Sequence, residues 1–463
     1  MPGRLVHLPH LNGERLREIG RLTWPQAAML LCQFVIGITD VWTGGRIGPD
    51  TQASIGLVAQ CQMLFMSLAM AAVSGAVASV SQSLGAGDAT RARRYVGLVV
   101  IGGIGLGCLL AGIGHLLRVP ILVFVQTPEA VLPVATLFFS MYMWSLPGQY
   151  ALTIGAAVFR AAKSVRMPLY VTLLACGLNL FGDLAFGLGW WGFPAFGATG
   201  VAWTTLVSVT AGAALMLGLL VRARLLTADG LPPLRWVRVG APYLIRVAGP
   251  ALGTSFLWQS GYLTLFVITA SLPVGSVTAL AGLTAGMRVE AFLFLPAVAF
   301  NMTASVLVGH ALGAGDRTEA RRVALTILGI ACGGMTLVGL CLWPWRAEAA
   351  GLLAPDPDVA RETATYLAYN ILSVPFTVAS VVLAGTLNGA GATVYPMLAF
   401  SVAVWLVRLP LAWLMGHVVW QDASGIYLSM LVSQMVQSSA LLWVLLRCDW
   451  TRFTLHVKQR RGV

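Results

Sequence analysis

The sequence has few charged residues. Asp, Glu, Lys and Arg make up 10% of its 463 residues, whereas hydrophobic residues make up 58%. A soluble domain carries about 25% charged residues, because its surface faces water. The chain therefore lacks the charge to cover soluble domains, and its mean hydropathy of +0.81 predicts an integral membrane protein.

Two further patterns are missing. The 7 cysteines include no Cys-x-x-Cys pair, so we interpret them as small packing residues and not as a disulfide or zinc framework. The stretches 98–110 and 297–308 are apolar on every face and lack the alternation of a membrane β-strand. The sequence therefore predicts an all-α membrane protein without a metal site.

Apolar runs separated by charged or turn-forming residues predict twelve transmembrane helices, each needing about 20 residues to cross the bilayer. The predicted spans are 24–47, 53–80, 95–125, 131–155, 168–191, 197–221, 242–270, 277–309, 323–353, 360–384, 395–419 and 424–447. With twelve spans, both termini lie on the same side of the membrane.

The basic residues are distributed unequally between the two sides. Of the 29 Lys and Arg residues, 23 fall on the side of the termini and only Arg46, Arg118, Arg346 and Arg361 on the other. Basic loops remain in the cytoplasm, so we expect cytoplasmic termini and a multi-pass protein of the inner (cell) membrane. The net charge of +12 is then a topology signal, and we expect no nucleic-acid partner.

The chain contains an internal repeat. Leu84–Asp88 recurs as Leu312–Asp316 at an offset of 228 residues, and Pro147 and Pro375 keep the same offset. Because each half has six spans, both halves enter the membrane in the same direction. We therefore predict two parallel six-helix lobes, an architecture typical of transporters. The predicted parts are a lobe at 1–221, a cytoplasmic linker at 222–241, and a lobe with a basic tail at 242–463.

Other functional classes find little support. No paired histidines or Gly-x-Ser-x-Gly elbow indicates a membrane enzyme, so we expect no catalytic residue, and no filter motif indicates a channel. The two Leu-Gly-Ala-Gly-Asp segments resemble phosphate-binding loops, but no Lys-Ser/Thr pair follows them. We interpret both segments as cytoplasmic turns.

Several segments together resemble the multidrug and toxin extrusion (MATE) family. They are TDVWTGGRIG (39–48), SQSLGAGDATRARR (81–94), NLFGD (179–183), GATGVAWTT (197–205), MRVEAFLFLPAVAFNMTASVLVGHALGAGD (287–316) and LNGAGATVYP (387–396). The resemblance implies a secondary transporter that exports amphipathic, often cationic, organic compounds by alternating access, in exchange for H⁺ or Na⁺. The same superfamily contains lipid-linked oligosaccharide flippases, so a lipid or lipid-linked-sugar flippase is the alternative.

Two acidic residues are predicted at one depth in the first half. Asp40 lies about seven residues, or roughly 10 Å, before the end of its span, and Asp183 lies about as deep in another. Asn179 precedes Asp183 by one helical turn, and Thr205 reaches the same level from the sixth span. Carboxylates at this depth are costly to insert, by at least about 2.5–3.5 kcal/mol, and point to an ion or proton pathway.

These oxygen-bearing side chains suit a monovalent cation, or a shared proton. The resemblance implies the same role, because the matching positions form the coupling-cation site of MATE proteins. At the repeat offset, the second half has Ile268, Val407, Leu411 and Ser433 instead. A scaffold role would require the four residues in both halves, so this asymmetry favours function.

The second half has its own intramembrane charges. Glu290 and Arg408 each lie about 13 residues inside a span, and we interpret them first as a buried ion pair; the alternative is a second proton or substrate-charge site. Further candidates for a substrate cavity are Gln60, Gln62, Tyr142 and Arg288. We expect no cofactor besides the coupling ion. The expected partners are small organic substrates and the lipid bilayer, with the protein a monomer.

Overall fold

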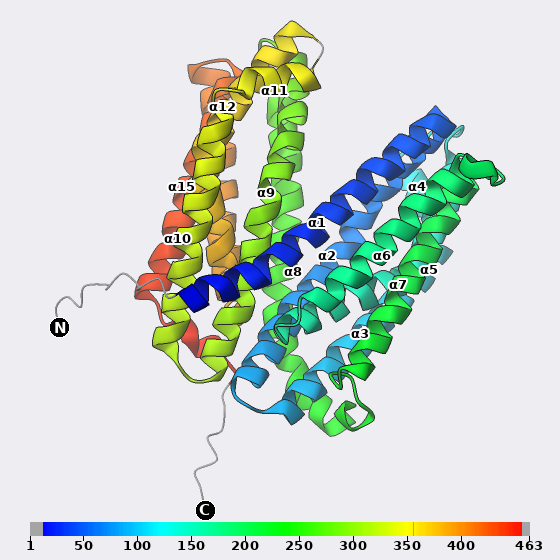
Figure 1. Ribbon diagram of the computed structural model, residues 1–463. Helices are drawn as coiled ribbons and strands as arrows, with labels where there is room; N and C mark the ends of the chain where they lie inside the picture. The colour runs from blue at the N-terminus through cyan, green and yellow to red at the C-terminus, as the bar shows by residue number, and fades with distance from the viewer. Residues whose placement is uncertain (1–12, 355, 456–463) are drawn as a thin grey trace, which may run out of the picture. The chain divides into compact units, whose positions relative to one another are not determined.

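The computed structural model describes residues 13–354 and 356–455 (Figure 1). These residues form helices and include no β-strand. The α-helices are α1 (Gly13–Ile47), α2 (Pro49–Gly85), α3 (Ala89–Leu116), α4 (Arg118–Phe124), α5 (Leu132–Ala161), α6 (Arg166–Gly182), α7 (Ala198–Arg222), α8 (Leu234–Ala270), α9 (Ser276–Gly313), α10 (Arg317–Leu342), α11 (Arg346–Leu353), α12 (Pro357–Gly389), α13 (Val394–Ser401), α14 (Leu409–Trp413) and α15 (Ala423–Arg447). Three π-helical segments, η1 (Asp183–Gly187), η4 (Val402–Arg408) and η5 (Leu414–Val419), extend or join them. Three short 3₁₀ turns are η2 (Trp190–Gly192), η3 (Ala228–Gly230) and η6 (Trp450–Phe453).

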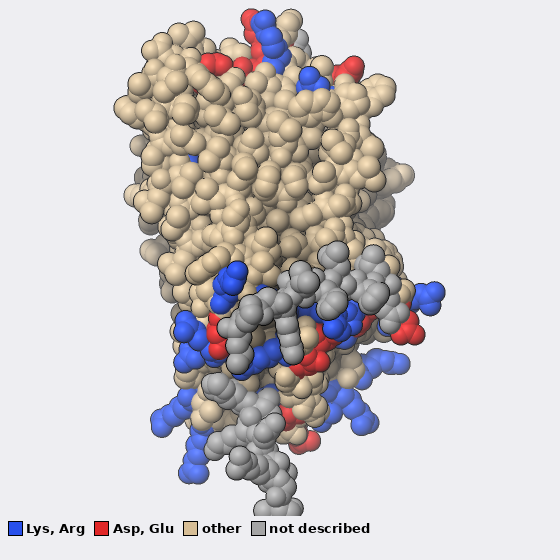
Figure 2. All heavy atoms as spheres, turned by 90° about the vertical axis from the view of Figure 1, so that its left-hand side faces the viewer, with Lys and Arg blue, Asp and Glu red and all other residues tan. Residues whose placement is uncertain are grey.

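Within the described ranges, 11 helices are long and apolar enough to cross a membrane. The run from α13 to η5 counts as one of them, Val394–Val419. The twelfth long helix is α5, which has 30 residues and packs against α2, α3 and α7. On the face drawn in Figure 2, charged residues gather at two ends and leave a broad zone nearly free of them. The prediction of an all-α membrane protein is confirmed, and α5 together with the 11 apolar helices corresponds to the twelve predicted spans. The predicted cytoplasmic residues Arg4, Lys458, Arg460 and Arg461 lie outside the described residues.

The chain separates into two compact units. We call Pro25–Ala248 the N-unit, and the residues up to Trp24 together with Gly249 and all that follow the C-unit. The boundaries lie inside α1 and α8 instead of in the connecting segments. The expected lobes were 1–221 and 242–463. In the structure, the start of α1 up to Trp24 belongs to the C-unit, and the start of α8 up to Ala248 belongs to the N-unit.

Specific contacts explain these boundaries. In the C-unit, Arg15 Nη2 at the start of α1 lies 2.6 Å from Glu319 Oε1 on α10. In the N-unit, the ring of Trp236 at the start of α8 packs edge-on to the ring of Tyr95 on α3, at 4.9 Å between centroids. The first turns of α1 and α8 are therefore held by the helices of the other half of the sequence.

The internal repeat is visible in the turns. Asp88 and Asp316 cap α3 and α10 by accepting from backbone N–H groups at 2.9 Å and 2.8 Å. Gly87 and Gly315 have positive φ angles of 71° and 82°, which glycine adopts without strain. The two Leu-Gly-Ala-Gly-Asp segments are therefore helix–turn–helix connections, as predicted.

The third and ninth predicted spans were too long. Span 95–125 is divided into α3 and the short α4, and span 323–353 into α10 and the short α11. At each break an arginine donates to a carbonyl oxygen that the helix end leaves free: Arg118 to His115 at 2.6 Å, and Arg346 to Trp343 at 2.9 Å. The same break at the same repeat position shows a shared plan.

Candidate cation site

Three neighbouring helices of the N-unit carry the four predicted side chains. Asp40 lies on α1, Asn179 on α6, Asp183 at the start of η1, and Thr205 on α7. About two turns before the two aspartates, the Sγ atom of Cys176 on α6 lies 3.7 Å from the carbonyl oxygen of Cys32 on α1. Because α1 and α6 pack side by side in this way, Asp40 and Asp183 reach the same level.

A π-helical turn begins at Asp183. The backbone N–H of Leu188 donates to the carbonyl oxygen of Asp183, five residues earlier, at 3.2 Å. Such wide turns inside α-helices occur frequently at functional sites. The extra residue changes the direction of the side chains that follow it, so the acidic residue lies where α6 departs from regular geometry.

Glycines let α7 approach this turn closely. A Cβ atom at Gly182 would lie 2.3 Å from the Thr204 methyl group, and one at Gly200 would lie 2.3 Å from the Phe186 carbonyl oxygen. Both distances are far below a normal contact, so only glycine fits. This close packing brings Thr205 within reach of α6.

The four side chains interact with one another. Asn179 Nδ2 donates to Thr205 Oγ1 at 3.4 Å, and the Thr205 hydroxyl donates to the Val201 carbonyl oxygen at 3.2 Å. The carboxyl groups of Asp40 and Asp183 lie close enough to influence each other electrostatically. The structure thus brings together all four residues that the depth argument placed at one level.

The cluster is rich in unpaired oxygen atoms. Asp183 is 0% and Asn179 2% exposed. Both carboxylate oxygens of Asp183, one of Asp40 and the amide oxygen of Asn179 are buried without a hydrogen-bond donor among the described residues. Buried acceptors without donors are costly, and a proton or a hard monovalent cation would satisfy them. The donor set therefore fits the expected coupling ion.

Sequence reasoning missed Thr43. This residue is 0% exposed, its hydroxyl oxygen has no hydrogen-bond partner in the described chain, and it borders Gly187 of η1. It follows Asp40 by three residues, so the two share one face of α1. That spacing was the signal available in the sequence, and Thr43 is a further oxygen ligand candidate.

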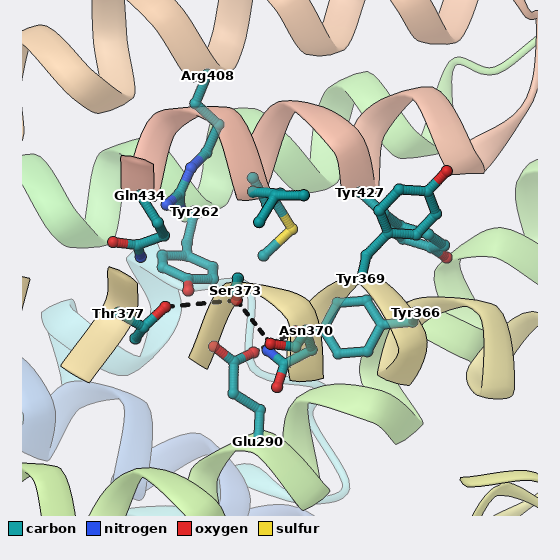
Figure 3. Close-up of a pocket in the computed structure, with 12 residues that line it drawn as sticks. Tyr262, Glu290, Tyr366, Tyr369, Asn370, Ser373, Thr377, Arg408, Tyr427 and Gln434 are labelled. Atoms are coloured by element: carbon teal, nitrogen blue, oxygen red, sulfur yellow. Dashed lines mark hydrogen bonds between the residues drawn. The ribbon is translucent and has the colours of Figure 1, made fainter. Parts of the chain in front are cut away.

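The C-unit contains a polar pocket inside its membrane-spanning helices (Figure 3). Glu290 from α9 and Arg408 from the end of η4 enter it from opposite sides. Its other polar lining residues are Tyr262, Tyr366, Tyr369, Asn370, Ser373, Thr377, Tyr427 and Gln434. Five of them lie on α12, where Tyr366, Asn370, Ser373 and Thr377 recur at spacings of three or four residues and form a polar stripe that the sequence analysis overlooked.

Glu290 and Arg408 do not form the expected direct ion pair, since no such pair occurs among the described residues. Glu290 Oε2 instead accepts from the Tyr366 hydroxyl, and Arg408 Nε donates to Ser433 Oγ at 2.8 Å. The Arg408 guanidinium also lies 5.9 Å from the Tyr262 ring centroid. Each charged side chain is therefore hydrogen-bonded to a neutral hydroxyl group and not to the opposite charge. The polar pocket separates the helices that carry Glu290 and Arg408.

The free space in this pocket is small. Its cavity volume of about 20 Å³ admits a water molecule, which needs roughly 10–15 Å³ on the same measure, but not an organic compound. The pocket therefore suits water or a small ion between the two charges.

The remaining candidates for a substrate cavity are dispersed. Gln62 Nε2 donates to Gln149 Oε1 at 3.4 Å, and Tyr142 is 5% exposed and packs against Phe65. Gln60 and Arg288 are exposed in their units. The structure does not gather these side chains into one site.

Comparisons with known proteins agree with the geometry. The MatE family model matches residues 25–184 and 250–414. A probable multidrug resistance protein NorM of Thermotoga maritima is 24% identical over 96% of this chain and 95% of its own length. The multidrug resistance protein NorM of Burkholderia vietnamiensis is 27% identical over 86% of this chain and 87% of its own.

Solved structures share the fold. The Vibrio cholerae MATE transporter VcmN in its bent form superposes with a TM-score of 0.86 at 20% identity, covering 96% of this chain and 99% of that one. Another MATE structure, in the bent conformation, gives a TM-score of 0.86 at 17% identity, covering 95% and 97%. With a family model that matches most of its helices, the chain belongs to the MATE family of membrane transporters.

Proposed function

We propose that this protein exports amphipathic, mainly cationic, organic compounds by antiport against H⁺ or Na⁺. The observation that carries the proposal is the N-unit cluster, where buried carboxylate and amide oxygens lack donors. A bound proton or cation lowers the cost of these charges in the membrane. The multidrug resistance proteins among the relatives support the substrate class.

The cluster can couple cation binding to movement. Asp40 and Asp183 come from different helices, α1 and α6–η1. Without a cation the two carboxylates repel each other, and with one bound they are held together. A cation drives transport only if its affinity differs between two arrangements of the protein. A cluster whose carboxylates come from two helices can meet that condition, because a change in the spacing of α1 and α6 would change its affinity for the cation.

Dye transport in proteoliposomes tests the proposal. The purified protein is reconstituted, and uptake or efflux of a cationic dye is followed under an imposed H⁺ gradient without Na⁺, and then under an imposed Na⁺ gradient at equal pH. Transport under one gradient alone assigns the coupling ion. Absence of transport under both gradients, with a series of cationic dyes, would contradict antiport.

We do not propose a flippase. The two intramembrane arginines are Arg288 and Arg408, and the Arg408 guanidinium is engaged by Ser433 and Tyr262. A cavity for anionic lipid phosphates is expected to offer several free cationic groups. Headgroup-labelled lipid in the same proteoliposomes provides the direct check.

The proposed setting is the inner membrane, with cytoplasmic termini, a monomer, and no nucleic acid or cofactor beyond the coupling ion. The excess of basic residues on one side supports this orientation. Cysteines introduced at 222–240 should react only with reagents that reach the cytoplasm, and those at 120–129 only from outside. The reverse labelling would overturn the topology.

A further inference from the structure

The starts of α1 and α8 occupy equivalent positions in the internal repeat but carry different charges. Arg15 and Glu18 on α1 correspond, at the offset of 228, to Tyr243 and Arg246 on α8. The helices that receive them also correspond: Glu319 and Arg322 on α10 match Arg91 and Arg94 on α3. We call the contact between the start of α1 and α10 the C-unit corner, and the contact between the start of α8 and α3 the N-unit corner. Because the two corners are equivalent in the repeat, each is a control for the other.

The corner in the C-unit is neutral and paired. Arg15 lies 2.6 Å from Glu319, and Arg322 lies 3.7 Å from the same carboxylate. Glu18 also has an interaction partner. The formal charges of the two arginines and two glutamates sum to zero, and Glu319 pairs with both arginines.

The corner in the N-unit has three arginines, Arg91, Arg94 and Arg246, and no acidic residue at the four positions. The acid near it is Asp88, 3.9 Å from Arg91, and its carboxylate already caps α3. Arg91 Nη2 and Arg94 Nε are buried without a hydrogen-bond partner among the described residues. The position that carries Glu319 in the C-unit thus carries a cation, Arg91, in the N-unit.

The guanidinium groups of this corner are held in place. Arg91 Nε donates to Ser83 Oγ at 3.0 Å, and the Arg94 guanidinium lies 6.0 Å from the Trp236 ring centroid. Tyr243 is 8% exposed and interacts electrostatically with Arg91 and Arg246. Three arginines with one nearby carboxylate leave a net positive charge, and guanidinium groups held beside aromatic rings form a ready site for an oxyanion, because guanidinium binds phosphate with two parallel N–H groups.

We propose that Arg91 and Arg94, with Trp236 beside Arg94, bind the phosphate of an anionic phospholipid headgroup, and that Arg246 on α8 adds to the positive charge of the site. The position favours a lipid over free phosphate, because the site lies among basic residues where α2 ends and α3 and α8 begin, which is the level of the anionic leaflet in the proposed orientation. Tryptophan and tyrosine prefer this same interfacial level. The lipid phosphate supplies the charge that Glu319 supplies in the C-unit.

Binding of short-chain phosphatidylglycerol to the full chain, followed by native mass spectrometry from a neutral detergent, tests the site. We expect the wild type to retain phosphatidylglycerol in preference to phosphatidylcholine. Arg91→Gln and Arg94→Gln should each weaken it about ten-fold, the effect of losing one charge-assisted hydrogen bond, and the charge-reversing Arg91→Glu should weaken it further because it repels the phosphate. The matched control is Arg222→Gln, an exposed arginine at the end of α7, which should leave binding unchanged.

Two results would overturn the proposal. Equal binding of phosphatidylglycerol by the wild type and both glutamine variants would remove the arginines from the site. Complete displacement of the lipid by millimolar inorganic phosphate would show that the site takes a free anion instead of a headgroup. Size-exclusion profiles of all variants establish that they are folded, and the two neutral variants suffice if Arg91→Glu is not.

Discussion

The two units use one helical plan for different chemistry. In the N-unit, acidic and polar side chains from α1, α6–η1 and α7 meet around Asp183, whereas the repeat-equivalent position in the C-unit is Leu411. In the C-unit, a polar pocket forms instead between α9, α12 and α15 around Glu290, whose N-unit counterpart is Gln62. The six-helix fold therefore accepts either an acidic or an uncharged residue at these two positions, so the fold does not require the acidic residues.

The central helices α5 and α12 show how the difference arises. Tyr366 and Asn370 of α12 line the C-unit pocket, and their counterparts on α5 are Phe138 and Tyr142. Phe138 and Tyr142 instead pack into an apolar core with α2 and α3. The same face of the central helix thus contributes to an apolar core in one unit and to a polar pocket in the other.

The largest expected effect concerns the N-unit cluster. Asp40→Asn and Asp183→Asn keep the side-chain volume and remove the charge, so each variant should fold, since a buried neutral amide costs less than a carboxylate. Gradient-driven dye export should fall at least ten-fold, the loss of about 1.4 kcal/mol of coupling. Transport assays in proteoliposomes, with dye binding measured separately, check this expectation.

The C-unit supplies the control for this experiment. Leu411→Asn introduces an amide at the equivalent position, where Ile268 and Val407 replace the other oxygen ligands. It should alter stability without altering cation dependence. Normal gradient-driven export by both aspartate variants would refute the coupling role, and loss of expression together with dye binding would indicate a structural one.

In the C-unit pocket the expected effect is on stability and not on coupling. Arg408→Met leaves Glu290 as an uncompensated buried charge, so we expect a loss of about 3 kcal/mol in stability. Glu290→Gln keeps an acceptor for the Tyr366 hydroxyl and should cost less. The double variant should regain part of the loss, because the two charges face one pocket. Thermal unfolding in detergent measures this, and strictly additive losses would show that the charges are independent.

Much of this architecture was accessible from sequence. Charge depletion and the repeat at 228 residues predicted the twelve helices, and the depth of Asp40 and Asp183 predicted that they meet. Depth is readable because a transmembrane helix advances about 1.5 Å per residue from a recognisable end. The position of Thr205 followed from the same arithmetic.

Other features were hidden because they depend on side-chain direction and local backbone geometry. The sequence placed Glu290 and Arg408 at similar depth, but the hydrophobic pattern does not specify which neutral hydroxyl each side chain reaches. The wide turn at Asp183 and the helix breaks before Arg118 and Arg346 also lack a hydropathy signal. The grouping of Arg15 with α10 depends on a contact 304 residues apart along the chain.

One turn allows the two units to be compared through a backbone angle. Gly391 has a φ angle of 78°, and Lys163, its repeat equivalent, has a φ angle of 59°. A side chain in this region costs roughly 1–2 kcal/mol. Gly391→Ala should therefore destabilise the protein by about 1 kcal/mol. Lys163→Gly relieves the strain, but glycine loses more entropy on folding. The two effects nearly cancel, so this variant should be neutral or slightly more stable. Unfolding temperatures of the two variants should shift in different directions or by clearly different amounts; equal destabilisation would contradict this.

The smallest expected effect lies after α15. Asp449 has no acidic counterpart in the N-unit, where Val221 occupies its position. The hydrogen bond from Thr451 and the nearby Arg317 lower the pKa of the Asp449 carboxyl. A carboxyl group whose pKa is lower in the folded state adds stability above its unfolded pKa, near 3.9, and this is lost as the pH falls through the folded value. Asp449→Asn should therefore lower the unfolding temperature slightly at pH 7, since exposed pairs contribute little, and the difference from wild type should vanish in acid. A difference that grows as the pH falls would show that Asp449 stabilises the chain end in its protonated form.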